Sequence, residues 1–344
     1  MDDAPPTVEL SPAGAGPSEL GPRAADLPHA PEVGWAKRLL GRYHVTGVFW
    51  FRFHFWGISI VPKWGVGAIV ALFTPFFFIC LIKVRRAISR NLEAVLGPCG
   101  FLRRQLRIFR TMWTFGWCLS ERYERLATDR SFRIDIDLPR WLSLFEPSRG
   151  FVMVTAHLGN FEVGSMLPAF EEDRQVHVVR EKEADPEAQQ FIQELLVRAG
   201  GTRYVTHFEG EHALQGVELV HVLRDGGIVG VQGDRPRSGG RIVPATLFGR
   251  PFPLPAGPAA LARAAEVPLV PIFVFRVARL HYRIEIRDPV PVGRSSSRER
   301  DIAEAMGQVA AEIEWAIRQQ PHQWFCFHDV WPRSKQGTGP SARP

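Results

Sequence analysis

FVMVTAHLGNFEVG, residues 151–164, is the stretch that decides the fold. Its first five residues are apolar or β-branched and polar residues follow directly, a pattern typical of a short buried strand. His157 comes just after this strand, at the carboxyl end where site residues collect in open α/β sheets. Gly159 and Asn160 suit a turn or a helix start, which places Glu162 in the first helical turn. Strand, polar turn and helix in this order predict an α/β fold.

Four further apolar runs extend this pattern along the chain. They are short enough to be strands, and helical patterns separate most of them. We therefore predict a mostly parallel central sheet flanked by helices. The last run alternates strictly between apolar and polar residues, which predicts an edge strand with one wet face. The expected strands are 151–155, 176–179, 228–232, 269–275 and 281–287, and the expected helices are 187–199, 256–265 and 299–320.

The spacing of His157 and Glu162 suits acid–base chemistry, because two side chains five positions apart can meet across a tight turn. A carboxylate bonded to one ring nitrogen sets the imidazole tautomer and raises the basicity of the other nitrogen. No nucleophile motif accompanies the pair, since Ser165 lies in VGSML rather than in GxSxG. Acyl transfer from a thioester to a hydroxyl would need only this pair and an oxyanion donor. The alternative is a buried structural histidine.

The net charge of +6 on the 344 residues is unevenly distributed. Residues 1–32 are rich in Pro and Ala and hold six acidic residues and one arginine, so this segment carries −5 and the rest of the chain about +11. Its composition predicts a disordered tail, and it lacks the basic start and apolar core of a secretory signal. Four widely spaced cysteines argue against a zinc ribbon and suit a reducing compartment.

The N-terminal third has the composition of a membrane-anchoring helical region. Residues 35–55 alternate large aromatics with Arg and His, as at a bilayer interface, although a buried core helix is the alternative. Residues 64–82 carry no charge and are long enough for a helix that nears the thickness of the bilayer core, with Pro75 near its middle. The basic residues that follow predict a cytoplasmic end. A full span and a re-entrant hairpin both fit this pattern.

Residues 83–128 are predicted to form two helices separated at Gly97-Pro98. On the second helix Arg103, Arg107 and Arg110 share one face beside apolar neighbours. Such a surface suits anionic lipid headgroups, and a solvated charged face is the alternative. We expect four segments in all: a disordered tail at 1–32, a membrane-associated helical region at 33–128, an α/β domain at 129–333 and a loose tail at 334–344.

With its downstream residues, the His157 motif resembles the bacterial lipid A biosynthesis acyltransferases, a lauroyl/myristoyl transferase family within the lysophospholipid acyltransferase superfamily. The superfamily signature is a histidine, four residues and an Asp or Glu, which here is His157-Leu-Gly-Asn-Phe-Glu162. Further matches are GDRP at 233–236 and LFGRPFPLPAGPAALARAAEVPLVPIF at 247–273. The resemblance extends over about residues 35–332.

The resemblance implies a membrane-associated O-acyltransferase that acts on a lipid A-type or other glycolipid acceptor. It implies His157 as the general base and Glu162 as the carboxylate that orients it. It also implies an acyl carrier protein or CoA thioester as the donor, no metal or redox cofactor, and a place at the bacterial inner membrane with the catalytic domain on the cytoplasmic side. Backbone N–H groups at the Gly159 turn would stabilise the oxyanion, and the fork of Arg250 suits a phosphate. The expected substrate-binding residues are Gly159, Asn160, Arg180, Asp234, Arg235 and Arg250.

Two departures from the family pattern leave the acceptor open. The segment WFCFHDVWPR, residues 324–333, differs from the His-Arg-Arg-Phe ending of the lipid A enzymes, and the acidic tail is extra. A lysophospholipid, ornithine lipid or pigment headgroup is an alternative acceptor, and a non-catalytic lipid-binding protein of the same fold is an alternative function. His328 and Asp329 either contribute to the site or belong to a packed aromatic C-terminus.

Weaker signals point to other functions. The spacing of Gly227, Gly230 and Gly233 resembles part of a nucleotide loop, but its place in the chain is wrong and no ribose-binding acid follows. In HFEGEH, residues 207–212, the two histidines do not share a helical face, so a polar loop is favoured over a metal site. A membrane surface explains the basic excess more simply than nucleic acid does.

Overall fold

The computed structural model describes residues 48–62, 64–127, 132–144, 150–161, 176–180, 204–208, 214–235 and 240–331, with residues 187, 189–191 and 194 between them. The two predicted tails, 1–32 and 334–344, and Glu162 lie outside these residues.

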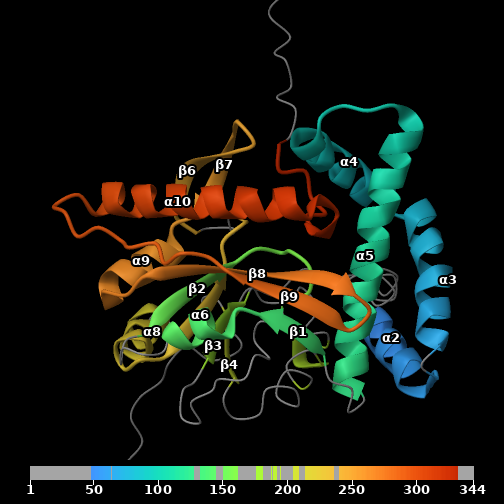
Figure 1. Ribbon diagram of the computed structural model, residues 1–344, viewed down its shortest axis with the longest axis horizontal. Helices are drawn as coiled ribbons and strands as arrows, with labels where there is room; N and C mark the ends of the chain where they lie inside the picture. Colours follow the sequence, from blue (N-terminus) through green and yellow to red (C-terminus); the bar gives the residue numbers. More distant parts are fainter. Residues whose placement is uncertain are drawn as a thin grey trace, which may run out of the picture. The chain divides into compact units, whose positions relative to one another are not determined.

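A seven-stranded sheet forms the centre of the described chain, in the order β1-β9-β8-β2-β5-β3-β4 (Figure 1). The neighbours from β8 to β4 are all parallel, while β9 runs antiparallel to β8 and β1 runs parallel to β9. This confirms the predicted mostly parallel sheet. The strands are β1 Arg133–Ile136, β2 Phe151–Thr155, β3 Val176–Arg180, β4 Tyr204–Phe208, β5 Ile228–Gln232, β8 Leu269–Ala278 and β9 His281–Ile286.

The prediction that residues 281–287 form an edge strand is wrong. β9 shows the expected alternation of buried and less buried residues, but it lies between β8 and β1. The partner strand β1 has only four residues and no apolar run, so nothing local marked it as a strand. A short polar strand of this kind covers an edge that would otherwise be exposed.

Helices cover both faces of the sheet because its central strands are apolar on both faces. Val152 and Val154 of β2 pack into one core cluster, and Phe151 and Met153 pack into a second cluster on the opposite face. The first cluster includes residues of three helices and the second includes Trp141 of α6 (Figure 1). These helices are α6 Leu138–Ser143, α8 Gln215–Arg224, α9 Gly257–Ala265 and α10 Arg298–Gln319.

A proline-rich hairpin outside the main sheet was not predicted. Strands β6 Ile242–Leu247 and β7 Arg250–Pro255 pair antiparallel, and the turn between them is Phe248-Gly249 with φ of 52° and 70°. Prolines disfavour central strands but are tolerated in a two-stranded ribbon, whose outer edges need no partner. The N–H of Phe248 donates to Oε2 of Glu314 on α10 at 2.6 Å, which ties the turn to the main body.

In the described part of the chain, four helices precede the sheet, and three of them pack against the longest. They are α2 Val48–Ile60, α3 Gly65–Cys80, α4 Ile82–Leu96 and α5 Phe101–Ala127. The predicted break at Gly97-Pro98 is confirmed. The helix expected over 64–82 is present but shorter: α3 runs through Pro75 and ends at Cys80, and the chain turns by 91° between α3 and α4 at Leu81. Within the described residues no helix alone has the length and apolarity to cross a bilayer, and the bent pair α3 and α4 meets that test only by length and composition.

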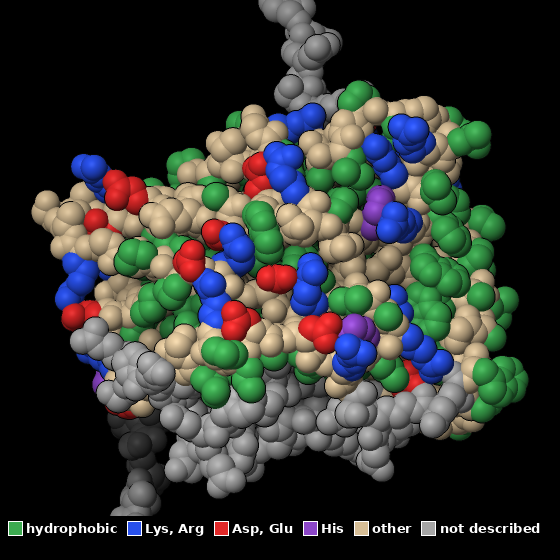
Figure 2. Space-filling view, in the orientation of Figure 1, with side chains coloured by type: hydrophobic (Ala, Val, Ile, Leu, Met, Phe, Trp, Pro, Cys, Tyr) green, Lys and Arg blue, Asp and Glu red, His purple; other side chains and the backbone are tan. Residues whose placement is uncertain are grey.

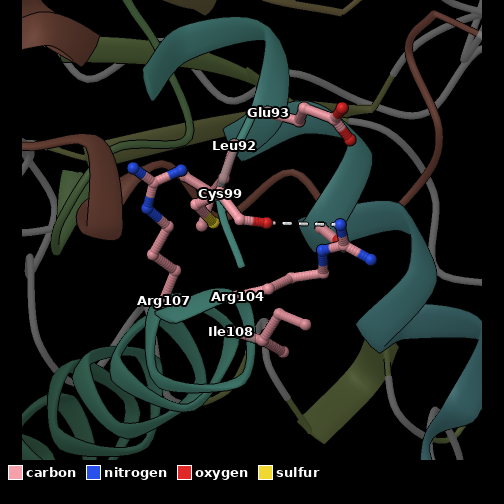
Figure 3. A pocket seen from close by; sticks show the side chains of 7 residues that line it. Leu92, Glu93, Cys99, Arg104, Arg107 and Ile108 are labelled. Atoms are coloured by element: carbon pink, nitrogen blue, oxygen red, sulfur yellow. Dashed lines mark hydrogen bonds between the residues drawn. The ribbon is translucent and has the colours of Figure 1, made fainter. Parts of the chain in front are cut away.

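Two arginines of α5 line a small pocket beside the turn that separates α4 from α5 (Figure 3). Arg107 donates to the carbonyl of Gly97 at 2.8 Å and Arg104 donates to that of Cys99 at 3.4 Å. Helix ends leave carbonyls without partners, and Arg107 supplies a donor at the end of α4, while Arg104 bonds the turn that follows. Arg107 therefore serves the fold, while Arg103 and Arg110 of the predicted basic face remain exposed.

Candidate active site

Two polar side chains from neighbouring strands meet at the carboxyl edge of the sheet. β2 and β5 are parallel and pair Thr155 with Gln232. His157 and Asp234 each lie two positions beyond that pair, so the shared register carries them to the same place. Nδ1 of His157 lies 2.7 Å from Oδ1 of Asp234.

The pair joins an accessible imidazole to a hidden carboxylate, since the side chain of His157 is 19% exposed and that of Asp234 is 0% exposed. Burial raises the pKa of Asp234, but the charge and hydrogen bond of His157, the charge of Arg235 and the hydrogen bond of Trp324 outweigh it. Together they hold the pKa of Asp234 well below its ordinary range. Ionised Asp234 can only accept, so Nδ1 of His157 donates and Nε2 of the neutral ring keeps its lone pair. This is the arrangement of a general base.

The C-terminal segment 323–325 borders the same turn. Its main chain lies antiparallel to the residues around His157: the N–H of Phe325 donates to the carbonyl of His157 at 2.8 Å, and the N–H of Gly159 donates to that of Gln323 at 2.9 Å. The indole N–H of Trp324 donates to Oδ2 of Asp234 at 3.1 Å. The predicted packed aromatic C-terminus is confirmed by the burial of Trp324 and Phe325, but its contact with the carboxylate had no signal in the sequence.

The model of the bacterial lipid A biosynthesis acyltransferase family matches residues 37–333. The chain belongs to this family. A search of curated proteins gives no match. The family match includes the His157 motif, GDRP at 233–236 and the segment 247–273, the three stretches on which the resemblance depends.

Gly159 gives this member of the lipid A acyltransferase family the tight turn after His157. Its φ is +58°, and a Cβ there would lie 2.1 Å from the carbonyl oxygen of Val274. Only glycine fits such a backbone next to a neighbouring strand. Because its N–H is bonded to Gln323, that N–H is engaged within the protein and is not free to stabilise an oxyanion.

The side chain of Asn160 lies in the interior. Its amide nitrogen is 3.4 Å from the carbonyl oxygen of Cys118 and 3.4 Å from the hydroxyl of Tyr282. Tyr282 in turn donates to Glu121 of α5, and Glu121 also holds the guanidinium of Arg276 at 2.7 Å. This network ties the turn of the site to the longest N-terminal helix, which is a structural role for Asn160.

The three arginines that were expected to contact substrate lie in three different parts of the structure. Arg235 follows Asp234 and donates to the carbonyl of Phe325 at 2.5 Å. Arg180 ends β3 at the same sheet edge as the histidine, because Val178 of β3 pairs with Gly230 of β5. Arg250 opens β7, and its Cζ lies 5.8 Å from the ring centre of Trp331. Arg235 is thus nearest to the acid–base pair, and the substrate roles of all three stay predictions.

The other polar residues that the sequence analysis named, as far as the structure describes HFEGEH and residues 328–329, make contacts away from the pair of His157 and Asp234. In the described part of the chain, no group of three or more His, Cys, Asp or Glu side chains is placed to hold a metal ion. His207 of HFEGEH lies instead on β4, with Nε2 at 2.8 Å from Nδ1 of His177. Asp329 forms an ion pair with Arg90 of α4, and the neighbouring His328 is exposed.

Proposed function

We propose that this acyltransferase-family protein moves a fatty acyl chain from a thioester to a hydroxyl of a lipid A-type or other glycolipid acceptor, with His157 as general base. The observation that carries the proposal is the contact between accessible His157 and buried, ionised Asp234. A carboxylate on Nδ1 makes Nε2 the basic nitrogen and stabilises the imidazolium that forms during the reaction.

The reaction is direct transfer without an acyl-enzyme. Nε2 of His157 takes the proton of the acceptor hydroxyl while its oxygen attacks the thioester carbonyl. The new C–O bond forms, the C–S bond breaks, and the leaving thiolate receives the proton from the imidazolium. The donor is acyl carrier protein or CoA carrying the acyl chain, and the residues of the chain need no metal or redox cofactor for these steps.

The charge that develops on the carbonyl oxygen needs a donor other than the N–H of Gly159, which Gln323 occupies. Arg235 is the best candidate for this donor, because it follows Asp234 in the chain and its Nε is buried without a hydrogen-bond partner among the described residues. Arginine donors also suit phosphates of the acceptor or donor. Glu162 remains a second carboxylate proposed to act on His157.

Membrane association is proposed from apolar side chains on the outside of the N-terminal helices. Phe49, Phe53, Trp56 and Ile60 of α2 are exposed at helical spacing, as are Leu72, Phe76 and Ile79 of α3. Figure 2 shows hydrophobic side chains gathered over this edge, with basic side chains over α4 and the start of α5. Such a surface suits insertion into one leaflet, and the bend at Leu81 favours this over a full span. We place the protein at the cytoplasmic face of a bacterial inner membrane.

The function is tested with the purified full chain in vesicles, labelled acyl carrier protein and CoA thioesters, and a panel of glycolipid and lysophospholipid acceptors. Transfer that is lost in His157→Ala is the expected result. Full transfer by His157→Ala would overturn the general-base role, and lipid retention without donor consumption would favour the lipid-binding alternative.

Membrane binding is tested separately by co-sedimentation with vesicles of zwitterionic and anionic lipid. We expect Leu72→Ser with Ile79→Ser to lower the partition coefficient by at least about tenfold, because two apolar side chains leave the bilayer. Leu214→Ser with Val217→Ser, at the start of α8, is the matched control, since these side chains are similarly exposed. Equal losses in both double variants would contradict docking through α3.

A further inference from the structure

Both carboxylate oxygens of Asp234 are engaged, and by different partners. Oδ1 meets Nδ1 of His157 at 2.7 Å, and Oδ2 accepts the indole N–H of Trp324 at 3.1 Å. Asp234 is 0% and Trp324 2% exposed, so water does not compete for the second contact. A carboxylate rotates easily about its last side-chain bond. The bond to Trp324 fixes that rotation with the other oxygen directed at the imidazole.

The backbone that carries Trp324 is joined to the backbone that carries His157. Leu158 and Trp324 form an antiparallel bridge, flanked by the bonds from Phe325 to His157 and from Gly159 to Gln323. The indole and the imidazole are therefore held by one small ladder, and Asp234 lies between them. This gives the tryptophan a fixed position relative to the reacting histidine.

A second contact holds the segment that follows the tryptophan. Asn91 of α4 is buried, and its amide nitrogen donates to the carbonyls of Cys326 at 3.0 Å and His328 at 2.8 Å. The N–H of Val330 reaches its amide oxygen at 3.4 Å. The position of Trp324 is thus determined from both ends of its segment.

We propose that Trp324 is a positioning residue for acyl transfer, which keeps Asp234 oriented on Nδ1 of His157. This rests on the proposed general-base function of His157. Packing alone does not explain why a tryptophan occupies this position. Its ring centre lies 6.2 Å from that of Trp331, and a phenylalanine would preserve most of that contact. Only the N–H reaches the carboxylate, so only the N–H bears on the orientation of the catalytic pair.

The test compares Trp324→Phe with the full-length wild type in vesicles. We expect kcat to fall about 10-fold to 100-fold, with the KM for thioester and acceptor changed less than about twofold, because a hydrogen bond to a buried charge is lost while the substrate surfaces are untouched. Trp331→Phe is the matched control. Trp331 lies seven positions after Trp324, and its indole N–H donates at 3.1 Å to the carbonyl of Pro251 on β7 rather than to Asp234. The kcat of this variant should stay at the wild-type value.

A spectroscopic readout separates this proposal from the general-base role. The low-field proton signal of the Nδ1–H bond is assigned as the one missing from His157→Gln, and it should shift or broaden in Trp324→Phe but not in Trp331→Phe. A wild-type kcat and signal in Trp324→Phe overturn the positioning role. If His157 is not the general base, the His157→Ala enzyme will remain active, whatever the proton signal shows.

Replacement of Trp324 by 3-benzothienylalanine covers the case in which the phenylalanine variant does not fold. Its sulfur takes the place of the indole N–H in a ring of nearly the same shape. The same fall in kcat supports the proposal, and a wild-type kcat overturns it.

Discussion

Nδ1 of His157 lies 2.7 Å from Oδ1 of Asp234 although 77 positions separate the two residues. The contact follows from the parallel register of β2 and β5, which ends with Thr155 beside Gln232. Neither residue alone marks a catalytic site. Their meeting at the carboxyl edge of the sheet, with the acid buried and the imidazole accessible, is the observation behind the proposed general base and its orienting carboxylate.

Asp234→Asn should lower kcat by about 10²-fold to 10⁴-fold, because the amide removes the charge that favours the imidazolium and can hold the wrong tautomer. The measurement is the steady-state rate of acyl transfer at saturating donor and acceptor. Asp225→Asn, just before β5, is the control and should keep the wild-type rate. A parallel Glu162→Gln variant compares the two carboxylates, and an Asp234→Asn enzyme with the wild-type kcat would exclude Asp234 as the orienting group.

Gly159→Ala should destabilise the protein by several kcal/mol and abolish transfer. The added Cβ would lie 2.1 Å from a backbone oxygen of β8, and Gly159 has a positive φ that alanine disfavours. Relief of the clash would require a shift of the backbone at Gly159 or in β8. The readout is the thermal midpoint with the initial rate. Gly249→Ala isolates the backbone term, because its φ is +70° with nothing within 4 Å of the new Cβ, and it should cost only about 1 kcal/mol. Equal losses would show that the close approach to β8 has no effect.

Arg276→Met should lower the free energy of unfolding by about 3–5 kcal/mol, since it leaves the carboxylate of Glu121 buried without its charged partner. Arg300→Met is the surface control: its pair with Glu304 is exposed on both sides, so its loss should leave the free energy of unfolding nearly unchanged. Denaturant unfolding in detergent measures both. The double variant Glu121→Gln with Arg276→Met should recover part of the loss, and no recovery would argue against an unpaired charge as the cause.

His322 should make the protein less stable in mild acid. Burial first, and then the charges of Arg110 and Arg107, lower the pKa of His322 to about 4. The unfolded chain binds the proton at its ordinary pKa near 6.5, so stability is complete above about pH 6.5 and is lost as the pH falls toward 4. His322→Gln removes this contribution, which we place at about 1–2 kcal/mol because the ring is only half-buried.

The measurement for His322 is the difference in thermal midpoint between pH 7.5 and pH 4.5. It should be smaller in His322→Gln than in the wild type. Replacing the exposed His221 by glutamine should leave the difference unchanged. The pKa of His54 is also lowered to about 4 by burial, so the wild-type pH dependence will not disappear entirely.

The sequence by itself determined the elements and the kinds of residue at the site. The ends of β2 and β5 and the bounds of α4, α5 and α10 follow from apolar periodicity and from Gly and Pro, which act between near neighbours. His157 after a strand and the matching motifs identified the family. Local composition also marked the N-terminal helices as unusually apolar, although it did not show the bend at Leu81, which has no glycine or proline.

Only the tertiary structure decided which residues meet. The register of β2 on β5 depends on the packing of both sheet faces, so the partner that Asp234 provides for His157 was not visible in the spacing of either motif. The same holds for Trp324 on the second oxygen of Asp234, for β1 beside β9, and for Arg107 on the carbonyls that end α4. Apart from the Arg107 contact, which spans only the turn between two helices, these contacts join segments far apart in the chain, and their positions are set by the packing of the whole core.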